Sequence, residues 1–165
     1  MGTKKPVLIL DANVLIDLLT SDRMILPLIS RYVGQVEVPT TIFDEVDGFT
    51  ANDCIELGIK MIEPTLYQVL SAASYPKPLS FYDWVCFLLA KDSERLCVTN
   101  DKALRSQCKK NNVDVMWELE MLCLLFEAGG LSREQCKAII LSIQQANPYY
   151  ITKGIVDRAF KRIGV

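Results

Sequence analysis

The chain contains no histidine among its 165 residues, and its six cysteines include no C-x-x-C pair. Catalytic triads with a histidine base are therefore excluded, and a zinc site would lack its usual ligand spacing. Several of the cysteines lie inside apolar runs, such as Cys86 in WVCFLLA. We expect them to be small buried hydrophobic residues in a reducing compartment.

The sequence also lacks long hydrophobic segments, internal repeats and low-complexity stretches. Asp, Lys or Glu interrupts every apolar run well before the roughly 18 residues that a membrane span needs. At the N-terminus, a run of five apolar residues reaches Asp11, which is too short for the apolar region of a secretory signal. We therefore expect a cytoplasmic protein with no membrane partner.

The composition is typical of a globular protein, because half of the residues are hydrophobic and 23% are charged. The length suffices for one well-buried domain and is too short for two ordinary ones. We expect a single domain over residues 1–165 with a core over about 5–128. After Gly129 and Gly130, residues 131–165 are expected to form a helical tail of the same domain.

The apolar residues predict strands that alternate with helices. The expected strands are short apolar runs at 7–10, 36–39, 59–62, 96–99 and 113–116. Helices are expected after Asp11 and at 24–32, 40–49, 65–73, 81–92, 102–111 and 117–128, with two more that begin near 132 and 152. Short strands that are apolar throughout are typical of a parallel sheet with helices on both faces, so we predict an α/β fold.

Two acidic residues directly follow expected strands. Asp11 comes after VLIL, and Asp101 comes two residues after Thr99 in LCVT. In a parallel α/β sheet, ligands bind at the carboxyl ends of the strands, so both acids are expected at the ligand-binding edge. Each has an alternative role, because an Asp at this position can simply cap the next helix.

A third acid is expected from the segment TIFDEVDGF. On a helix, Ile42, Val46 and Phe49 share one face, and Glu45 lies at the flank of that face. Asp44 points nearly opposite, and Asp47 lies well to the side, so both are expected to be solvated. Glu45 is therefore the acid in this segment that we expect at the site.

The fourth acid is Asp83, three residues after Ser80 in SFYDWVCFLLAKD. One interpretation is a capping box, in which Asp83 stands where Glu or Gln is preferred. However, residues 84–90 are apolar all round, so this helix is expected to be buried, and an acid in its first turn is hard to explain by solubility. We therefore also treat Asp83 as a candidate site residue.

Asp11, Glu45, Asp83 and Asp101 can thus converge on one edge of the sheet. Packed together they would repel one another and their pKa values would rise, unless a cation neutralises them. Oxygen ligands without Cys or His select hard ions such as Mg²⁺ or Mn²⁺. Carboxylates that hold such ions are suited to the hydrolysis of phosphodiester bonds.

With these four positions in hand, the chain resembles the PIN-domain nucleases, especially the VapC-like toxins of toxin–antitoxin pairs. The matching segments are LILDANVLIDLL, VPTTIFDEV, LSFYDWVCFLLA and LCVTNDKALR, in the family's order over about residues 7–125. The resemblance implies a three-layer α/β/α sandwich, Mg²⁺ or Mn²⁺, and endoribonuclease activity on RNA. It also implies Asn13 and Thr99 as polar supports of the acids, and as partners an antitoxin protein and a second copy of the chain.

The net charge of −2 argues against a nucleic-acid partner, but the distribution of charge is uneven. The segment KALRSQCKK (102–110) carries four basic and no acidic residues. Lys102 at the start of its helix could meet a phosphate, and Arg105 and Lys109 could follow the RNA backbone. The alternative is a solvated helix face, and the basic segment 153–162 is the next candidate for RNA binding.

Two other functions are compatible with parts of the pattern. One is a PIN-like module that binds RNA or protein without catalysis, although such a module has no reason to keep four mutually repulsive acids. The other is a phosphoaspartate receiver or phosphatase-like protein, which would need paired acids around the first strand. Asp11 lies between Leu10 and Ala12, so that pair is missing.

Overall fold

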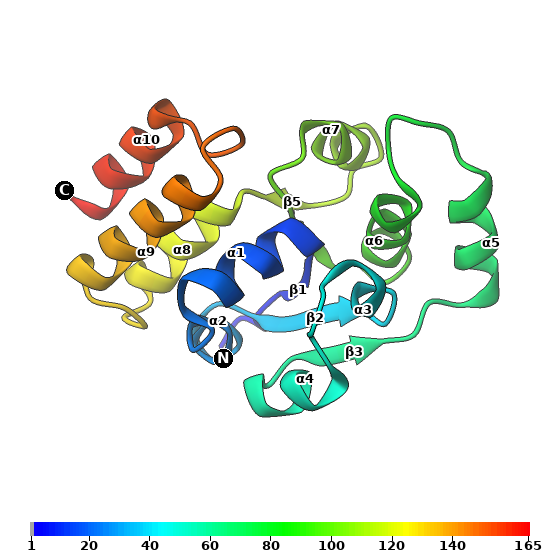
Figure 1. Cartoon of the computed structure of the whole chain (residues 1–165), viewed down its shortest axis with the longest axis horizontal. Coiled ribbons are helices and arrows are strands. Elements are labelled where there is room, and N and C mark those ends of the chain that lie inside the picture. Colours follow the sequence, from blue (N-terminus) through cyan, green and yellow to red (C-terminus); the bar gives the residue numbers. More distant parts are fainter. Residues whose placement is uncertain (1) are drawn as a thin grey trace.

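The computed structural model describes residues 2–165, which contain a five-stranded sheet whose neighbouring strands are all parallel. The strands are β1 (Val7–Leu10), β2 (Gln35–Pro39), β3 (Lys60–Ile62), β4 (Leu96–Val98) and β5 (Val115–Met116). They lie in the order β3-β2-β1-β4-β5, so the first strand of the chain is the middle strand of the sheet (Figure 1). The predicted parallel sheet is confirmed.

Helices cover both faces of this sheet. The buried side chains form two hydrophobic clusters, one on each face of the sheet. The first cluster includes residues of α1 (Ala12–Asp22), α2 (Ile25–Tyr32), α3 (Ile42–Glu45), α4 (Ala51–Leu57), α8 (Glu118–Glu127), α9 (Arg133–Ala146) and α10 (Lys153–Ile163). The second includes residues of α5 (Leu66–Ser74), α6 (Phe81–Asp92) and α7 (Lys102–Lys110). Successive strand residues point to opposite faces. In β1, Leu8 and Leu10 belong to the first cluster and Ile9 to the second. The three-layer α/β/α sandwich is confirmed.

The helix α6 is buried on almost every side, as its sequence predicts. Residues 84–90 are all buried, because α6 lies against β1 and β4 and contacts α5 and α7 as well. The helix begins with a capping box, in which the side chains of Ser80 and Asp83 each bond to the other's backbone N–H. The start of α6 is therefore fixed by local hydrogen bonds.

The segment after β2 differs from the prediction of one helix over 40–49. The helix α3 is only one turn long and ends at Glu45, because Val46 has an extended backbone with φ −115° and ψ 98°. Gly48 follows with φ 73°, a left-handed conformation that glycine adopts without strain. Thr50 then forms a capping box with Asp53 and starts α4, a helix that was not predicted.

The tail packs against the rest of the molecule. Ile140 of α9 and Ile163 of α10 are buried in the same cluster as Leu8 of β1, and α9 contacts both α1 and α8. Figure 1 shows α9 and α10 beside α8 at one end of the molecule, with α5 at the other. All six cysteines are free and buried, which confirms that they are buried residues. Within residues 2–165, no helix is both long and apolar enough to cross a membrane.

Candidate functional site

The strand order creates a specific place for a site. From β1 the chain continues to β2 and β3 on one side, whereas β4 and β5 lie on the other side of β1. The carboxyl ends of β1 and β4 therefore flank the point where the order of the strands reverses. In open α/β sheets this point is where ligands bind. Asp11 follows β1, and Thr99, Asn100 and Asp101 follow β4.

Asp11 lies in this crevice and is only 5% exposed. Although it is the N-cap residue of α1, its side chain does not cap that helix. Its Oδ2 instead accepts a hydrogen bond from the hydroxyl of Thr99 at 2.8 Å. Burial raises the pKa of Asp11 to about 6; the bond from Thr99 opposes this, and the charges of Asp83 and Asp101 add to it. The charge of Asp11 is therefore poorly compensated by the protein itself.

Thr99 connects two of the candidate acids. It is fully buried, its Oγ1 donates to Asp11, and the same oxygen accepts from the backbone N–H of Asp101 at 3.0 Å. A buried hydroxyl with both functions occupied holds its neighbours in fixed positions. Asn13, the other predicted support, is exposed on α1, and its side chain has no hydrogen bond to an acid among residues 2–165, so its supporting role stays a prediction.

Glu45, the last residue of α3, has the most strongly perturbed partly buried carboxyl group at this edge. Burial raises the pKa of Glu45 to about 7, and the charges of Asp11, Asp83 and Asp44 contribute to the shift. Asp44 and Asp47 are exposed, as predicted. The reasoning from a continuous helical face was wrong, since α3 ends at Glu45, but this residue is nevertheless the acid of its segment that interacts with Asp11 and Asp83.

Asp83 and Asp101 each use one carboxylate oxygen to accept hydrogen bonds at the start of a helix. Oδ2 of Asp83 accepts from the backbone N–H and the hydroxyl of Ser80, both at 2.9 Å. Oδ1 of Asp101 accepts from the backbone N–H of Leu104 at 2.8 Å. The capping alternatives are therefore real for both residues. The other carboxylate oxygen of each residue accepts no hydrogen bond from residues 2–165. Burial raises the pKa of Asp83, and the negative charge of Asp101 adds to this shift.

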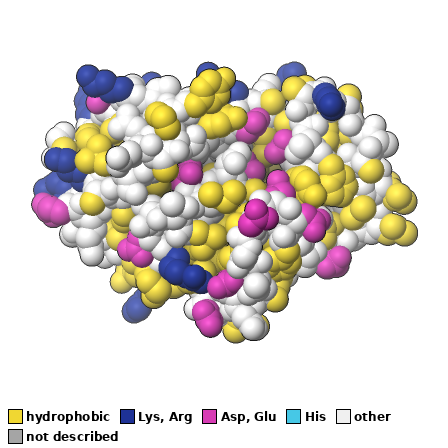
Figure 2. Space-filling view, viewed as in Figure 1, with side chains coloured by type: hydrophobic (Ala, Val, Ile, Leu, Met, Phe, Trp, Pro, Cys, Tyr) yellow, Lys and Arg dark blue, Asp and Glu magenta, His cyan; other side chains and the backbone are white. Residues whose placement is uncertain are grey.

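The four carboxylates, Asp11, Glu45, Asp83 and Asp101, are called the edge acids below. Figure 2 shows acidic side chains gathered on the surface between α1, α3, α6 and α7. Across residues 2–165, no three carboxylates or thiols stand close enough to hold one metal ion as a ready-made group. The donor chemistry nevertheless fits Mg²⁺ or Mn²⁺, because Mg²⁺ keeps several water ligands and is commonly bound through one or two carboxylates.

A second group of acids, which was not among the predicted site residues, lies near the first. Glu118 at the start of α8 is fully buried, and its Oε2 accepts from Nδ2 of Asn100 at 2.7 Å. Burial and the charge of Asp17 raise its pKa well above the usual range. Its Oε1 has no partner in the described chain unless Glu118 carries a proton, which it can then donate to Asp17. Asn147 also donates to Asp17, at 3.3 Å.

Asp17 and Glu118, called the interior pair below, could have been found from the sequence. Glu118 is an acid in the first turn of an apolar helix, which is the same feature that drew attention to Asp83. The charge of Asp11 also acts on Glu118, so the interior pair and the edge acids are electrostatic neighbours.

The predicted RNA-binding residues of α7 have different surroundings. Lys102 and Lys109 are exposed, as the prediction requires. Arg105 is only 6% exposed, and its guanidinium lies 3.5 Å from the centre of the Trp117 ring. The contact of Arg105 with an RNA backbone stays a prediction, which the packing of this side chain against Trp117 does not favour.

Comparison with known proteins does not assign this chain to a family. No family model matches the chain, and neither the curated proteins nor the solved structures contain a match to it. The geometry of the edge acids is therefore the basis for the functional argument.

Proposed function

We propose that this chain is a Mg²⁺- or Mn²⁺-dependent endoribonuclease of the PIN type, similar to the VapC-like toxins. One observation carries the proposal: Asp11 and Glu45, from different segments, meet at the strand-order reversal, where burial and then the charge of Asp11 raise the pKa of Glu45 to about 7. Carboxylates kept in mutual repulsion lower the stability of the fold, and strongly perturbed acids in a crevice are typical of functional sites. An antitoxin partner and a homodimer stay predictions from the resemblance.

The edge acids would hold the metal ion, which supplies Lewis acid catalysis and an activated water at a phosphodiester when bound. The protein's own side chains have separate parts in this proposal. Thr99 fixes the orientation of Asp11 through its 2.8 Å hydrogen bond. In the absence of a metal ion, the carboxyl of Glu45 has a pKa of about 7, and a bound cation would lower this pKa and favour the charged carboxylate. Lys102, exposed at the start of α7, is available to a phosphate group.

The cysteines support a cytoplasmic location. All six are free and buried, which suits a compartment where thiols stay reduced.

The experiment that tests the function is cleavage of a labelled single-stranded RNA by the purified protein, with Mg²⁺, with Mn²⁺ and with chelator. Asp11→Asn should reduce metal-dependent cleavage at least about a hundredfold, since even outer-shell partners of a metal typically contribute 10–100-fold. The matched control is Asp47→Asn, which removes the same charge from an exposed position. Equal cleavage by Asp11→Asn and the wild type in Mg²⁺ would refute the proposal.

A PIN-like binding module without catalysis is the second candidate function. Two observations favour it: Asp83 and Asp101 already serve as helix caps, and residues 2–165 contain no ready-made metal group. The same cleavage experiment decides between the candidates. If the protein binds the RNA but leaves it intact in both Mg²⁺ and Mn²⁺, the binding module is correct.

A further inference from the structure

A groove opens directly beside Asp101, and the C-terminal tail forms one of its sides. Its volume is about 610 Å³. Asp101 and Lys102 line it from the start of α7, whereas Tyr149 and Tyr150 line it from the loop between α9 and α10. Trp117 and Arg158 line it as well. We call it the aromatic groove.

The two tyrosine side chains of this groove are exposed to solvent. Tyr149 is 84% exposed, and its ring centre lies 5.0 Å from that of Tyr150 at an interplanar angle of 85°. This edge-to-face contact supports the rings while leaving aromatic surface open to solvent. An exposed pair of this kind buries little apolar area within the chain, so folding alone does not account for it. It is suited to stacking with a flat ligand.

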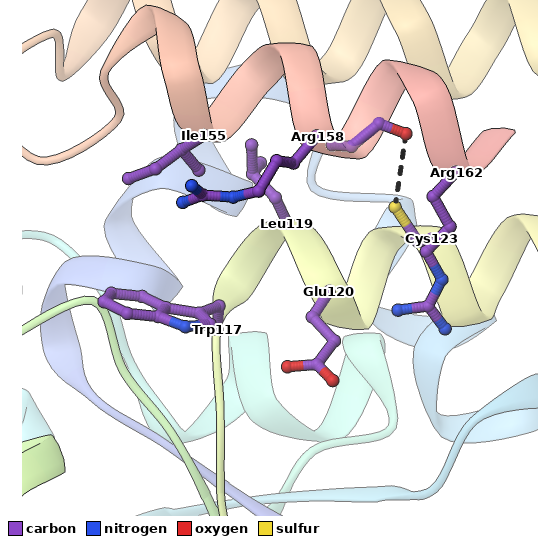
Figure 3. Close-up of a pocket in the computed structure, with 8 residues that line it drawn as sticks. Trp117, Leu119, Glu120, Cys123, Ile155, Arg158 and Arg162 are labelled. Atoms are coloured by element: carbon purple, nitrogen blue, oxygen red, sulfur yellow. Dashed lines mark hydrogen bonds between the residues drawn. The ribbon is translucent and has the colours of Figure 1, made fainter. Parts of the chain in front are cut away.

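Trp117 joins the aromatic groove to two neighbouring hollows. One, of about 420 Å³, also contains Lys109 and Lys110. The other lies between α8 and α10. Ile155 and Arg158 extend from α10 on one side of this hollow, and Trp117 lies on the other side (Figure 3). The guanidinium of Arg105 packs over the indole ring of Trp117. The three hollows therefore share one aromatic side chain in their lining.

Within the described chain, four exposed cations that form no ion pair line these hollows, together with the acids Asp101 and Glu120. Lys102, Lys109, Lys110 and Arg158 are all exposed. Within residues 2–165, ion pairs involve other cations, and none of these four takes part in one. Unpaired cations interleaved with aromatic rings are the arrangement that binds single-stranded nucleic acid, since the cations meet phosphates and the rings meet bases.

We infer that the aromatic groove binds single-stranded RNA, with a base stacked on Tyr149 and phosphates held by Lys102 and Arg158. The scissile phosphate would then lie at Asp101, and for that point the inference rests on the proposed function. A duplex keeps its bases stacked on one another and cannot offer a free base face to a tyrosine. The tail would thus select unpaired segments as substrates.

Binding is measured by fluorescence anisotropy of a labelled 12-nucleotide single-stranded RNA, in chelator so that no cleavage occurs. Tyr149→Ala should weaken binding about five- to a hundredfold, the range for one stacked base. Tyr149→Phe should bind like the wild type, because stacking needs the ring and not the hydroxyl. Tyr67→Ala is the matched control, since Tyr67 on α5 is 72% exposed and lies outside the groove.

The charged side of the groove is tested by the salt dependence of the same binding. Arg158→Ala should reduce the slope of log affinity against log salt by about 0.7, the value for one phosphate contact on a single strand. Lys137→Ala, which removes an exposed cation from α9, should leave the slope unchanged. The wild type should prefer the single strand to a duplex of the same sequence.

An independent signal comes from tryptophan emission. The chain has two tryptophans, and Trp84 is 7% exposed on α6, so a change on adding RNA reports on Trp117. Saturating single-stranded RNA should change the emission. Unchanged emission, equal binding by Tyr149→Ala and the wild type, or tighter binding of the duplex would each overturn the groove assignment. None of these results bears on metal-dependent cleavage, so the groove can fail while the proposed function stands.

Discussion

The edge acids and the interior pair lie next to each other, yet their surroundings differ. Glu118 and Asp17 receive hydrogen bonds from the side-chain amides of Asn100 and Asn147. Burial raises the pKa of both carboxyl groups, so that one proton held between them would remove their repulsion. Asp11 has a single hydroxyl partner, and within residues 2–165 no Lys or Arg pairs with an edge acid. Amide groups thus satisfy part of the interior pair and leave Oε1 of Glu118 without a partner in residues 2–165, whereas the hydrogen bonds of the edge acids come from one hydroxyl and two helix caps.

The difference teaches that a raised pKa does not by itself identify a functional acid. Burial is the largest cause of the shift for Asp11, Glu45 and Glu118 alike. What separates them is access to a compensating charge. Glu118 is fully buried beside the amide group of Asn100, whereas Asp11 is 5% exposed and Glu45 is half-buried at the carboxyl edge of the sheet. We therefore assign a structural role to the interior pair and a functional role to the edge acids.

The largest stability effect is expected in the interior pair. Glu118→Ala should lower the free energy of unfolding by about 2–4 kcal/mol, because it opens a cavity and removes a partner of Asn100. Glu118→Gln should cost less than about 1 kcal/mol, since an amide can accept from Asn100 and donate to Asp17. Urea denaturation at pH 7 measures both. Equal losses in the two variants would show that the interior pair needs its charge, and the contrast would fail.

A slightly smaller effect is expected from pH, and it belongs to the edge acids. The pKa values of Asp11 and Glu45 in the folded state, about 6 and about 7, exceed their ordinary values of 3.8 and 4.5. The folded state therefore binds more protons than the unfolded state. The resulting stability is complete below about pH 4 and is lost as the pH rises to about 7. Because the two groups are coupled, we expect a total loss of roughly 2–3 kcal/mol.

This pH dependence is measured by urea denaturation in chelator at pH 5 and pH 7.5. In the double variant Asp11→Asn, Glu45→Gln the difference between the two pH values should shrink, because neither amide titrates. Glu118→Gln is the comparison for the interior pair. If the double variant keeps the full pH dependence, then other groups cause it and the edge acids are better compensated than their environment indicates.

The smallest of these effects is stabilisation by metal. At a concentration 10 to 100 times its Kd, Mn²⁺ or Mg²⁺ should stabilise the fold by about 1–3 kcal/mol, because it binds the folded state. For a chain of this size, that corresponds to a melting temperature higher by about 3–8 °C than in chelator. Thermal unfolding should show the shift in the wild type and in Glu118→Gln, and a reduced shift in Asp11→Asn. A full shift in Asp11→Asn would place the metal elsewhere.

Local sequence patterns were sufficient for most of the secondary structure. The apolar runs predicted all five strands, and Ser80 with Asp83 indicated the capping box that starts α6. The same S/T-x-x-D pattern occurs at Thr50 and Asp53, where it starts α4. The predicted helix over 40–49 is longer than the observed α3, which ends at Glu45. Ile42, Val46 and Phe49 have helical spacing, but they are also all buried when one helical turn is followed by a loop that returns to the core.

Arg105 shows why side-chain roles are harder to predict than elements. Its position four residues before Lys109 predicts a shared helix face, which is correct for a regular α7. The structure buries it because Trp117, twelve residues further along the chain, supplies an aromatic face for its guanidinium. The contact cannot be predicted from residues 102–110 alone, because Trp117 lies outside this segment.

The sequence by itself determined where the strands end and which residues follow them, because burial and periodicity are local properties of the chain. It therefore determined that Asp11 and Asp101 lie at the carboxyl edge of a parallel sheet. Only the tertiary structure decided that β1 and β4 are neighbours, which brings Thr99 within 2.8 Å of Asp11. It also decided that Oε1 of Glu118 is buried without a partner in residues 2–165 and that Tyr149 lines the same groove as Asp101. These outcomes depend on contacts between residues far apart in the chain, and such contacts are set by how the helices and strands pack together.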